Sequence, residues 1–307
     1  MLCSCRVVFS GKVFGERSSG LYSGALSAKA QRQCRRVHHL YKLQDLLCQS
    51  KRYPFYQRGA GAVNKSIGII LGLIPYSESS QILKVFNAEK AQISVIAKGW
   101  RKKQEPLLRF GEYEFNLFEP KEEGLYILKE AGLLQDFSQY PSTSTWAAAE
   151  AGAELLSKIL ISASEAGEYY ALLHNYLSYL QKLENNAILI FWRLFLRVFK
   201  LMGINPELNK CSICGSDDGP AAFSGASETI CKSCFSQVIN RDYYVALSLE
   251  ERNILSLLPE IGKHLDSIIP DAEAVNKLNA FFLAYYSAQQ KQTLKLKSLS
   301  VLSQFYH

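Results

Sequence analysis

The 307-residue sequence contains no apolar run long enough to cross a membrane. The apolar stretch Ile67–Pro75 is far shorter than the roughly 20 residues that a membrane-spanning helix needs. A second apolar stretch, Ala187–Met202, is interrupted by Arg193 and Arg197. Hydrophobic residues make up 48% of the chain and charged residues 21%, a composition that excludes a mostly disordered protein. We therefore expect a folded protein without a membrane segment.

Motifs of the common catalytic sites are also missing. The sequence has no G-x-x-x-x-G-K-[ST] phosphate loop and no H-E-x-x-H metal motif. Gly59 and Gly61 lack the third glycine of a dinucleotide-binding loop. His174 and His264 have no nucleophile paired with them in any known pattern, and the acidic residues are spread along the chain. We therefore expect that the protein is not an enzyme.

Acidic residues are scarce at the amino terminus. Residues 1–66 contain 12 Lys and Arg but only two acidic residues, whereas the other 241 residues contain 23 basic and 26 acidic ones. The net charge of +7 therefore belongs to the amino-terminal stretch. Residues 1–65 are interpreted as a basic extension, which is a disordered arm, a transit peptide, or an artefact of a misassigned start when translation really begins near Val63. None of these alternatives makes the extension a folded domain.

Residues 66–140 show the pattern of a small β-domain. Short segments of alternating or β-branched residues predict strands over residues 66–75, 81–87, 91–98, 108–119 and 124–131. Short strands at intervals of about 8–12 residues, with turns between them, are typical of a small barrel or sandwich. Their order and lengths favour a barrel of the OB type.

Residues 141–307 show the 3.6-residue period of helices. The pattern predicts helices over residues 145–162, 164–180, 186–202, 249–258 and from 271 through 286. Ser164, Ser248 and Asp271 are candidate amino-terminal caps, and Gly203 is a candidate for the residue after a helix end. The expected fold is thus α+β and multidomain, with an OB-fold barrel followed by an all-α domain that carries an inserted zinc module at residues 208–240.

The inserted module is defined by a regular cysteine pattern. Cys211, Cys214, Cys231 and Cys234 form C-x2-C-x16-C-x2-C. Two C-x2-C turns can direct four thiolates at one tetrahedral ion, and such a site leaves no position open for a catalytic water. The pattern therefore predicts a structural Zn²⁺ ion. The other cysteines, Cys3, Cys5, Cys34 and Cys48, follow no regular spacing.

A basic segment follows the third expected strand. Lys98, Arg101, Lys102 and Lys103 surround Trp100. The bases suit the phosphates of a nucleic acid and the tryptophan suits stacking on a base, although a solvated loop remains the alternative. The candidate DNA-binding residues are Lys98, Trp100, Arg101, Lys102, Lys103 and Arg109, with Lys84 and Lys90 as possible extensions of the patch.

Three blocks of the sequence resemble the RecO family of recombination and repair proteins. The blocks are the strand segments Ile67–Leu71, Tyr76–Ser79 and Ile82–Phe86, the segment Glu89–Lys102 with its Lys98-Gly99 pair, and the helix-to-cysteine junction Arg193–Gly215. Ala88 and Ala91 stand where the family pattern has Thr and Gly, and Gln104-Glu105 replaces its Lys-Ser. The resemblance covers residues 66–307.

The resemblance implies a fold and a function. The fold is an OB barrel, a helical domain and a zinc module. The function is binding of single- and double-stranded DNA, annealing of complementary strands, and cooperation with RecR in loading RecA onto DNA coated by single-strand binding protein. The family also implies a bacterial, cytoplasmic, nucleoid-associated protein.

Family members hold the acidic tail of single-strand binding protein in their helical domain. A groove between apolar helix faces, rimmed by bases, would suit such a peptide. Arg193, Arg197 and Lys200 recur at helical spacing, so they share one helix face and are candidates for this rim. The residues alone leave two rivals open, a zinc-ribbon RNA-binding or transcription factor and a zinc-dependent nucleic-acid enzyme.

Overall fold

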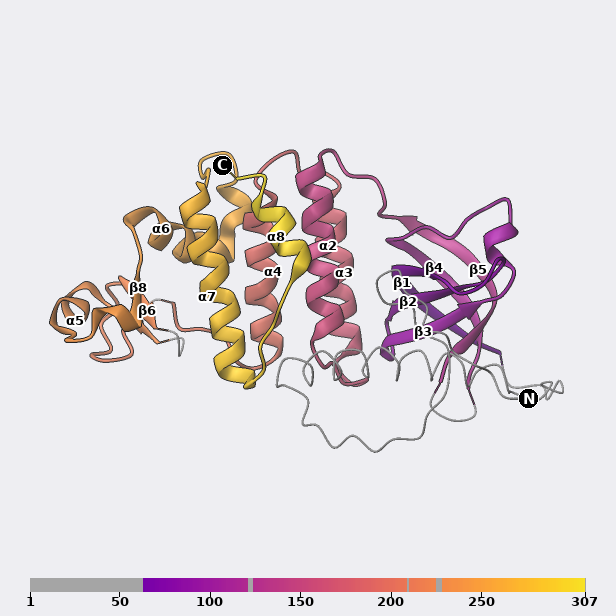
Figure 1. Ribbon diagram of the computed structural model, residues 1–307, viewed down its shortest axis with the longest axis horizontal. Coiled ribbons are helices and arrows are strands. Elements are labelled where there is room, and N and C mark those ends of the chain that lie inside the picture. The colour runs from indigo at the N-terminus through magenta and orange to yellow at the C-terminus, as the bar shows by residue number, and fades with distance from the viewer. Residues whose placement is uncertain (1–62, 121–123, 209, 225–227, 307) are drawn as a thin grey trace, which may run out of the picture. The chain divides into compact units, whose positions relative to one another are not determined.

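The computed structural model describes residues 63–120, 124–208, 210–224 and 228–306, and it begins with a β-rich domain that is followed by helices (Figure 1). The interpretations of residues 1–62 fall outside the described residues. Residues 63–65 belong to the first strand, so the β-domain begins at Val63 and not at the expected Ser66. No helix among the described residues is long and apolar enough to span a membrane.

Five strands close into a barrel in the order β1-β2-β3-β5-β4. The strands are β1 (Val63–Pro75), β2 (Gln81–Asn87), β3 (Ala91–Ala97), β4 (Gly111–Phe118) and β5 (Tyr126–Asp136). All neighbouring pairs are antiparallel except β3 and β5, which are parallel. Alternate residues such as Leu83, Val85, Val95 and Phe115 point inward and fill the barrel with an apolar core.

The turn between β2 and β3 is held by Asn87. Its side-chain oxygen accepts hydrogen bonds from the backbone N–H groups of Glu89 and Lys90, both at 2.9 Å. Such bonds are the usual reason for Asn at a turn. Ala91, which replaces the glycine of the family pattern, has φ of +57° in the left-handed region. The residue at this position therefore carries a backbone strain that glycine would avoid.

Strand β5 is longer and more bent than expected. Two bulges interrupt its pairing with β4, one between the pairs Leu117–Leu128 and Asn116–Glu130, the other between the pairs Tyr113–Leu133 and Glu112–Gln135. Each bulge leaves one residue of β5 unpaired, Lys129 and Leu134 respectively. Bulges bend a strand and redirect the unpaired side chain. The strand therefore continues as one bent element to Asp136, beyond residue 131, where the sequence predicts its end.

The helices begin and end close to their expected positions. They are α2 (Thr143–Lys158), α3 (Ala166–Leu180), α4 (Ala187–Leu201), α6 (Leu249–Leu257), α7 (Ala272–Gln290) and α8 (Lys297–Ser303), the last of which was not expected. Ser248 and Asp271 accept hydrogen bonds from the helix backbone as predicted, and Gly203 follows the end of α4 with φ of +72°. The cap predicted at Ser164 is wrong, because α3 begins after Glu165 without a side-chain cap.

Helix α4 lies at the centre of the helical core. Most of its side chains are buried, and Phe195 and Phe199 stack on Phe282 of α7. The indole N–H of the fully buried Trp192 donates to the side chain of Asn279 at 2.7 Å. A buried polar group is costly unless it is hydrogen-bonded, so this bond fixes how α4 and α7 pack.

The helical core also covers part of the barrel's outer surface. Ile69, Leu71 and Phe86 point away from the barrel interior and belong to the same apolar cluster as the helices. At the edge of this contact, the side-chain N–H of Gln92 donates to the carbonyl of Leu156, near the end of α2, at 2.8 Å. Such a donor satisfies a carbonyl that has no partner within its helix. The helices therefore block one side of the barrel and leave the rest of its surface open.

The crossing of α2 with α3 and α4 depends on the missing side chain of Gly152. A Cβ atom there would overlap the ring of Tyr176 and approach Leu194 to 3.0 Å. We expect Gly152→Ala to lower the free energy of unfolding by about 1–3 kcal/mol, despite the higher helix propensity of alanine. The matched control is Gly167→Ala in α3, where the nearest atom would lie at 3.8 Å. Urea unfolding in which both variants behave alike would contradict this packing.

Candidate nucleic-acid interface and metal site

The basic segment forms a short, well-anchored turn. Gly99 has φ of +76°, which lets the chain leave β3 sharply and enter the single-turn 3₁₀ helix η2 (Trp100–Lys102). The backbone N–H of Arg101 donates to the carbonyl of Ser79 at 3.1 Å, and its guanidinium donates to the carbonyl of Ser77. The turn between β1 and β2 therefore holds the basic segment in place.

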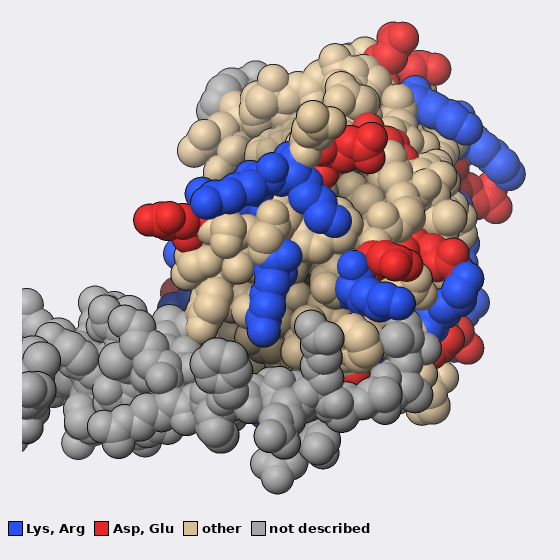
Figure 2. Space-filling view, turned by 90° about the vertical axis from the view of Figure 1, so that its right-hand side faces the viewer, with Lys and Arg blue, Asp and Glu red and all other residues tan. Residues whose placement is uncertain are grey.

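The positive side chains of this turn face solvent. Lys98, Arg101, Lys102 and Lys103 are all exposed. Among the described residues, none of the four forms an ion pair with an acid. Residues 63–140 contain ten basic and ten acidic residues, so four bases in one turn make a local concentration of charge. Figure 2 shows lysine and arginine side chains gathered on this end of the molecule, with acidic side chains around them.

Trp100 does not have the role predicted for it. Only 8% of its surface is exposed, and the indole packs in the barrel core. The ammonium of Lys103 covers one face of the ring, 3.4 Å from its centroid. A ring in this position anchors the turn to the barrel and offers no free face to a nucleic-acid base. The prediction of an exposed stacking tryptophan is therefore wrong.

Two of the other predicted bases form ion pairs with acidic residues of the same chain. Arg109 forms an ion pair with Glu150 of α2, and Lys90 forms one with Glu119. The hydrogen bond that the Lys90 ammonium donates to Glu119 raises the pKa of Lys90, and its bond to Tyr126 contributes less. Both bases therefore serve contacts within the chain. The predicted extension at Lys84 is exposed, and its ammonium donates to the hydroxyl of Ser94 on β3 at 2.8 Å.

The structure adds one base that the sequence analysis did not select. Lys129 is exposed at a bulge of β5. Because β3 and β5 are parallel and Ile96 pairs with Ile127, Lys98 and Lys129 follow at equivalent positions two residues later. The parallel pairing therefore brings Lys129 to the same end of the barrel as Lys98. The separation of Lys129 from Lys98 by thirty residues hides this placement from any local pattern.

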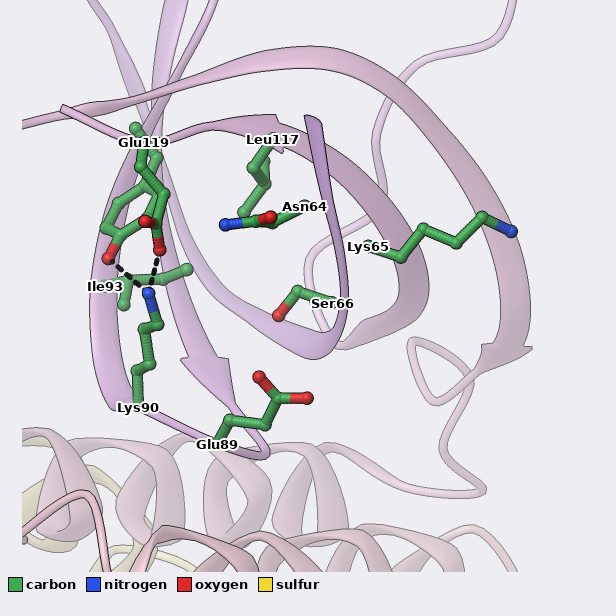
Figure 3. Close-up of a pocket in the computed structure, with 9 residues that line it drawn as sticks. Asn64, Lys65, Ser66, Glu89, Lys90, Ile93, Leu117 and Glu119 are labelled. Carbon is green, nitrogen blue, oxygen red and sulfur yellow. Dashed lines mark hydrogen bonds and ion pairs between the residues drawn. The ribbon is translucent and has the colours of Figure 1, made fainter. Parts of the chain in front are cut away.

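The barrel also has a small cavity at its other end. The cavity has a volume of about 250 Å³ and is bordered by Asn64, Ser66, Glu89 and the Lys90–Glu119 pair (Figure 3). Figure 3 shows the ammonium of Lys65 directed away from it. With Lys65 directed away, two acids and one base border this opening, so its charge does not favour an anion. The excess of positive charge on the barrel is confined to the basic turn and its neighbours.

The three bases predicted on α4 do not border the cavity found among the helices. Arg193 is half-buried near the hydroxyl of Tyr179, whereas Arg197 and Lys200 are exposed. A cavity of about 480 Å³ lies between α7 and α8, with Leu283, Leu296 and Leu299 among the residues that line it. The exposed Lys295 and Lys297 flank Leu296. None of the three predicted bases lines this cavity, whose lining mixes leucine and alanine with asparagine and serine side chains.

The four cysteines come together as their spacing predicts. One sulfur atom from each of Cys211, Cys214, Cys231 and Cys234 lies within 4.8 Å of the others. The knuckle at Cys211 is closed by the backbone N–H of Gly215, which donates to the carbonyl of Cys211 at 2.9 Å, with φ of +71° at the glycine. The second pair sits where Cys231 caps the short helix α5 (Lys232–Gln237).

A small sheet supports the cluster. Strands β6 (Ala222–Ser224), β7 (Thr229–Ile230) and β8 (Tyr244–Ala246) form it, with β6 in the centre. Ala222 and Ile230 pack with Cys211 and Cys231 in a core of only a few side chains. So small an apolar core stabilises little by itself, which is the usual situation of a domain that depends on a metal.

The cysteine sulfurs are suited to a metal that prefers thiolates. Burial raises the pKa of the Cys211 thiol, but backbone N–H groups of Cys214, Cys231 and Ile213 outweigh it and lower the value to about 6. The neighbouring Cys214 thiol raises the pKa of Cys234 to about 12. The interaction between the neighbouring thiols opposes their joint ionisation, and a bound cation would compensate the charge of the thiolates. The separation of 3.7 Å between the sulfurs of Cys214 and Cys231 is close to the roughly 3.8 Å expected around a tetrahedral Zn²⁺.

Comparison with known proteins agrees with this architecture. The family described as "Recombination protein O N terminal" matches residues 63–137, and "Recombination protein O C terminal" matches residues 142–299. The chain is 27% identical over 225 residues to "DNA repair protein RecO" of Halalkalibacterium halodurans, covering 67% of this chain and 87% of the relative. It is also 27% identical over 182 residues to the protein of the same name from Listeria monocytogenes serotype 4b, covering 57% and 70% respectively.

Replacing one cysteine of the cluster should release the metal. We expect Cys211→Ser to reduce bound metal from about one ion per chain to near zero and to destabilise the module by several kcal/mol. Elemental analysis of the purified protein and thermal unfolding measure the two effects. Cys48→Ser makes the same chemical change outside the cluster and should retain the metal. Equal metal content in the two variants would rule out the four-thiolate site.

Loss of the partner of Glu150 should give a pH-dependent penalty. Burial raises the pKa of Glu150, and Arg109 opposes that shift. A carboxyl group whose pKa is raised in the folded protein lowers the free energy of unfolding as the pH rises through that pKa. Arg109→Gln removes the opposing charge and so raises the pKa of Glu150 further. The half-exposed arginine limits the loss to roughly 1–2 kcal/mol, larger at pH 8 than at pH 5. Urea unfolding at both pH values measures the loss, with Lys65→Gln as the control. A loss of unfolding free energy that is the same at pH 5 and pH 8 would contradict the pairing of Arg109 with ionised Glu150.

Proposed function

Because the chain belongs to the recombination protein O family of DNA repair proteins, we propose that it acts as a recombination mediator. In this proposal the protein binds single- and double-stranded DNA and anneals complementary strands. It also helps RecR to load RecA onto DNA coated by single-strand binding protein. The proposed setting is the bacterial cytoplasm, in association with the nucleoid.

The observation that carries the DNA-binding proposal is the exposed basic turn beside an open barrel surface. Lys98, Arg101 and Lys102 extend from a turn that the barrel core anchors through Trp100, and Lys129 lies at the same end of the barrel as Lys98. A rigid group of lysines and arginines without acidic partners is what phosphate binding needs, since each contact releases condensed counterions. We propose that the β-domain is an OB-type barrel that presents this group to the DNA backbone.

Annealing requires charge neutralisation and no bond chemistry. Two complementary strands repel each other, and a surface that neutralises the phosphates of both lowers the cost of bringing them together. In this proposal the protein is therefore not an enzyme. The closed four-thiolate cluster fits this proposal, because a structural Zn²⁺ ion with four protein ligands holds the fold and leaves no ligand position for a reacting water.

A second contact is proposed on the helical domain. The tail of single-strand binding protein would need a groove with apolar contacts and bases nearby. The cavity between α7 and α8 offers Leu283 and Leu299 beside polar side chains such as Asn276, and Lys295 and Lys297 lie next to its lining residue Leu296. Arg193, Arg197 and Lys200 lie away from that lining and remain candidates for contacts with other partners of the pathway. RecR is the proposed direct partner, and RecA is reached only indirectly.

Neutralising the basic turn should weaken DNA binding in a salt-dependent way. The change is Lys98→Gln with Arg101→Gln and Lys102→Gln. We expect affinity for an oligonucleotide to fall by about tenfold or more at low salt. The slope of log K against log salt should become shallower by about 0.7 for each lost contact with a single strand. Fluorescence anisotropy between 50 and 200 mM salt would measure both quantities.

The control for this experiment is a surface lysine on the same barrel. Lys65→Gln removes an exposed base that pairs with Glu114 on β4, so it should change neither the affinity nor the salt slope. An unchanged affinity and slope in the triple variant would discard the basic turn as the DNA site. Comparing RNA with DNA of the same sequence in the same assay would expose an RNA-binding protein.

A further inference from the structure

Three isoleucines form a row across the open side of the barrel. Ile82 on β2 pairs with Ile96 on β3, and Ile96 pairs with Ile127 on β5. The neighbours Leu83, Val95, Ala97 and Leu128 point into the barrel core, so the three isoleucines point outward. This isoleucine row therefore crosses three adjacent strands on one face.

Neither apolar core covers the isoleucine row, and its two ends meet Ile74 of β1 and Phe118 of β4, which pair with Ile82 and Ile127. Each of its members is partly exposed, and none belongs to the barrel core or to the helical core that covers Ile69, Leu71 and Phe86 on the other side. Side chains on the outside of a half-solvated barrel are usually polar. A row of three aliphatic side chains across strands is thus a departure from the expected alternation.

Lysines flank the isoleucine row on both sides. Two residues away in one direction lie Lys84 and its partner Ser94. Two residues away in the other direction lie Lys98 and Lys129, and beyond them the basic turn. The face thus alternates cationic, aliphatic and cationic. Its charge complements an extended polyanion whose uncharged groups can lie against the middle row.

We propose that the isoleucine row receives the bases of single-stranded DNA, while Lys84, Lys98 and Lys129 hold the phosphates on either side. The row would take the place of the buried Trp100, which cannot stack on a base. The bases of a single strand are free to turn toward the protein, whereas those of a duplex are paired and stacked inside it. The row therefore favours single-stranded over double-stranded DNA, and the basic turn serves both. This inference rests on the proposed DNA-binding function.

The experiment compares substitutions at the centre of the row. Ile96→Thr keeps a β-branched side chain but removes most of the apolar contact, and Ile96→Phe offers a ring for stacking. We expect Ile96→Thr to bind a single-stranded oligonucleotide about five- to tenfold more weakly, and Ile96→Phe to bind it several-fold more tightly, at about 100 mM salt. Affinity for the matching duplex should stay within about twofold in both variants. Ile67→Thr, at an exposed isoleucine on β1, is the matched control.

The outcomes separate this inference from the function beneath it. If the unaltered protein binds neither single strands nor duplexes, the proposed DNA-binding function fails. If it binds both but Ile96→Thr weakens neither or weakens both equally, the function stands and the role of the isoleucine row is wrong. An oligonucleotide without bases gives a further check, because Ile96→Thr and the unaltered protein should bind it with equal affinity.

Discussion

The packing of Ile69, Leu71 and Phe86 against the helical core decides which part of the barrel is available to a ligand. A closed barrel has no free strand edges, so its ligands must use its outer surface, its ends or its loops. The helices cover the part of β1 that carries Ile69 and Leu71 and the end of β2 that carries Phe86. On β3, Gln92 hydrogen-bonds the end of α2. The outer surfaces of β2, β3 and β5 near the basic turn remain open, as do exposed positions on β1 and β4 such as Ile67 and Glu114.

The open face of β2, β3 and β5 carries the positive charge of the barrel that no acid among the described residues neutralises. Elsewhere on the barrel, bases such as Lys90 and Arg109 are held by Glu119 and Glu150. Burial of Trp100 fixes the basic turn to this face, much as the cysteine cluster fixes the small module beyond the helices. The basic turn and the small module have few apolar contacts of their own, so a buried tryptophan holds the first in place and the cysteine cluster the second.

Much of the fold could be predicted from periodicity, since alternation marked the strands and caps such as Ser248 and Asp271 marked the helices. The cysteine cluster could also be predicted, because its ligands lie in two short motifs. The site on the barrel could be predicted only in part. Whether Trp100 is exposed depends on barrel closure, and whether Arg109 is free depends on Glu150 of another domain. Lys129 comes to the same end of the barrel as Lys98 only through parallel pairing of β3 with β5.

In the proposed complex, DNA lies on the open face of β2, β3 and β5. The most direct test is chemical labelling of lysines, read by mass spectrometry, with and without a single-stranded oligonucleotide. Bound DNA should protect Lys84, Lys98, Lys102 and Lys129. The exposed Lys65 and Lys263 should react as before. Protection of Lys65 without protection of Lys98 and Lys129 would place the DNA elsewhere and contradict the account.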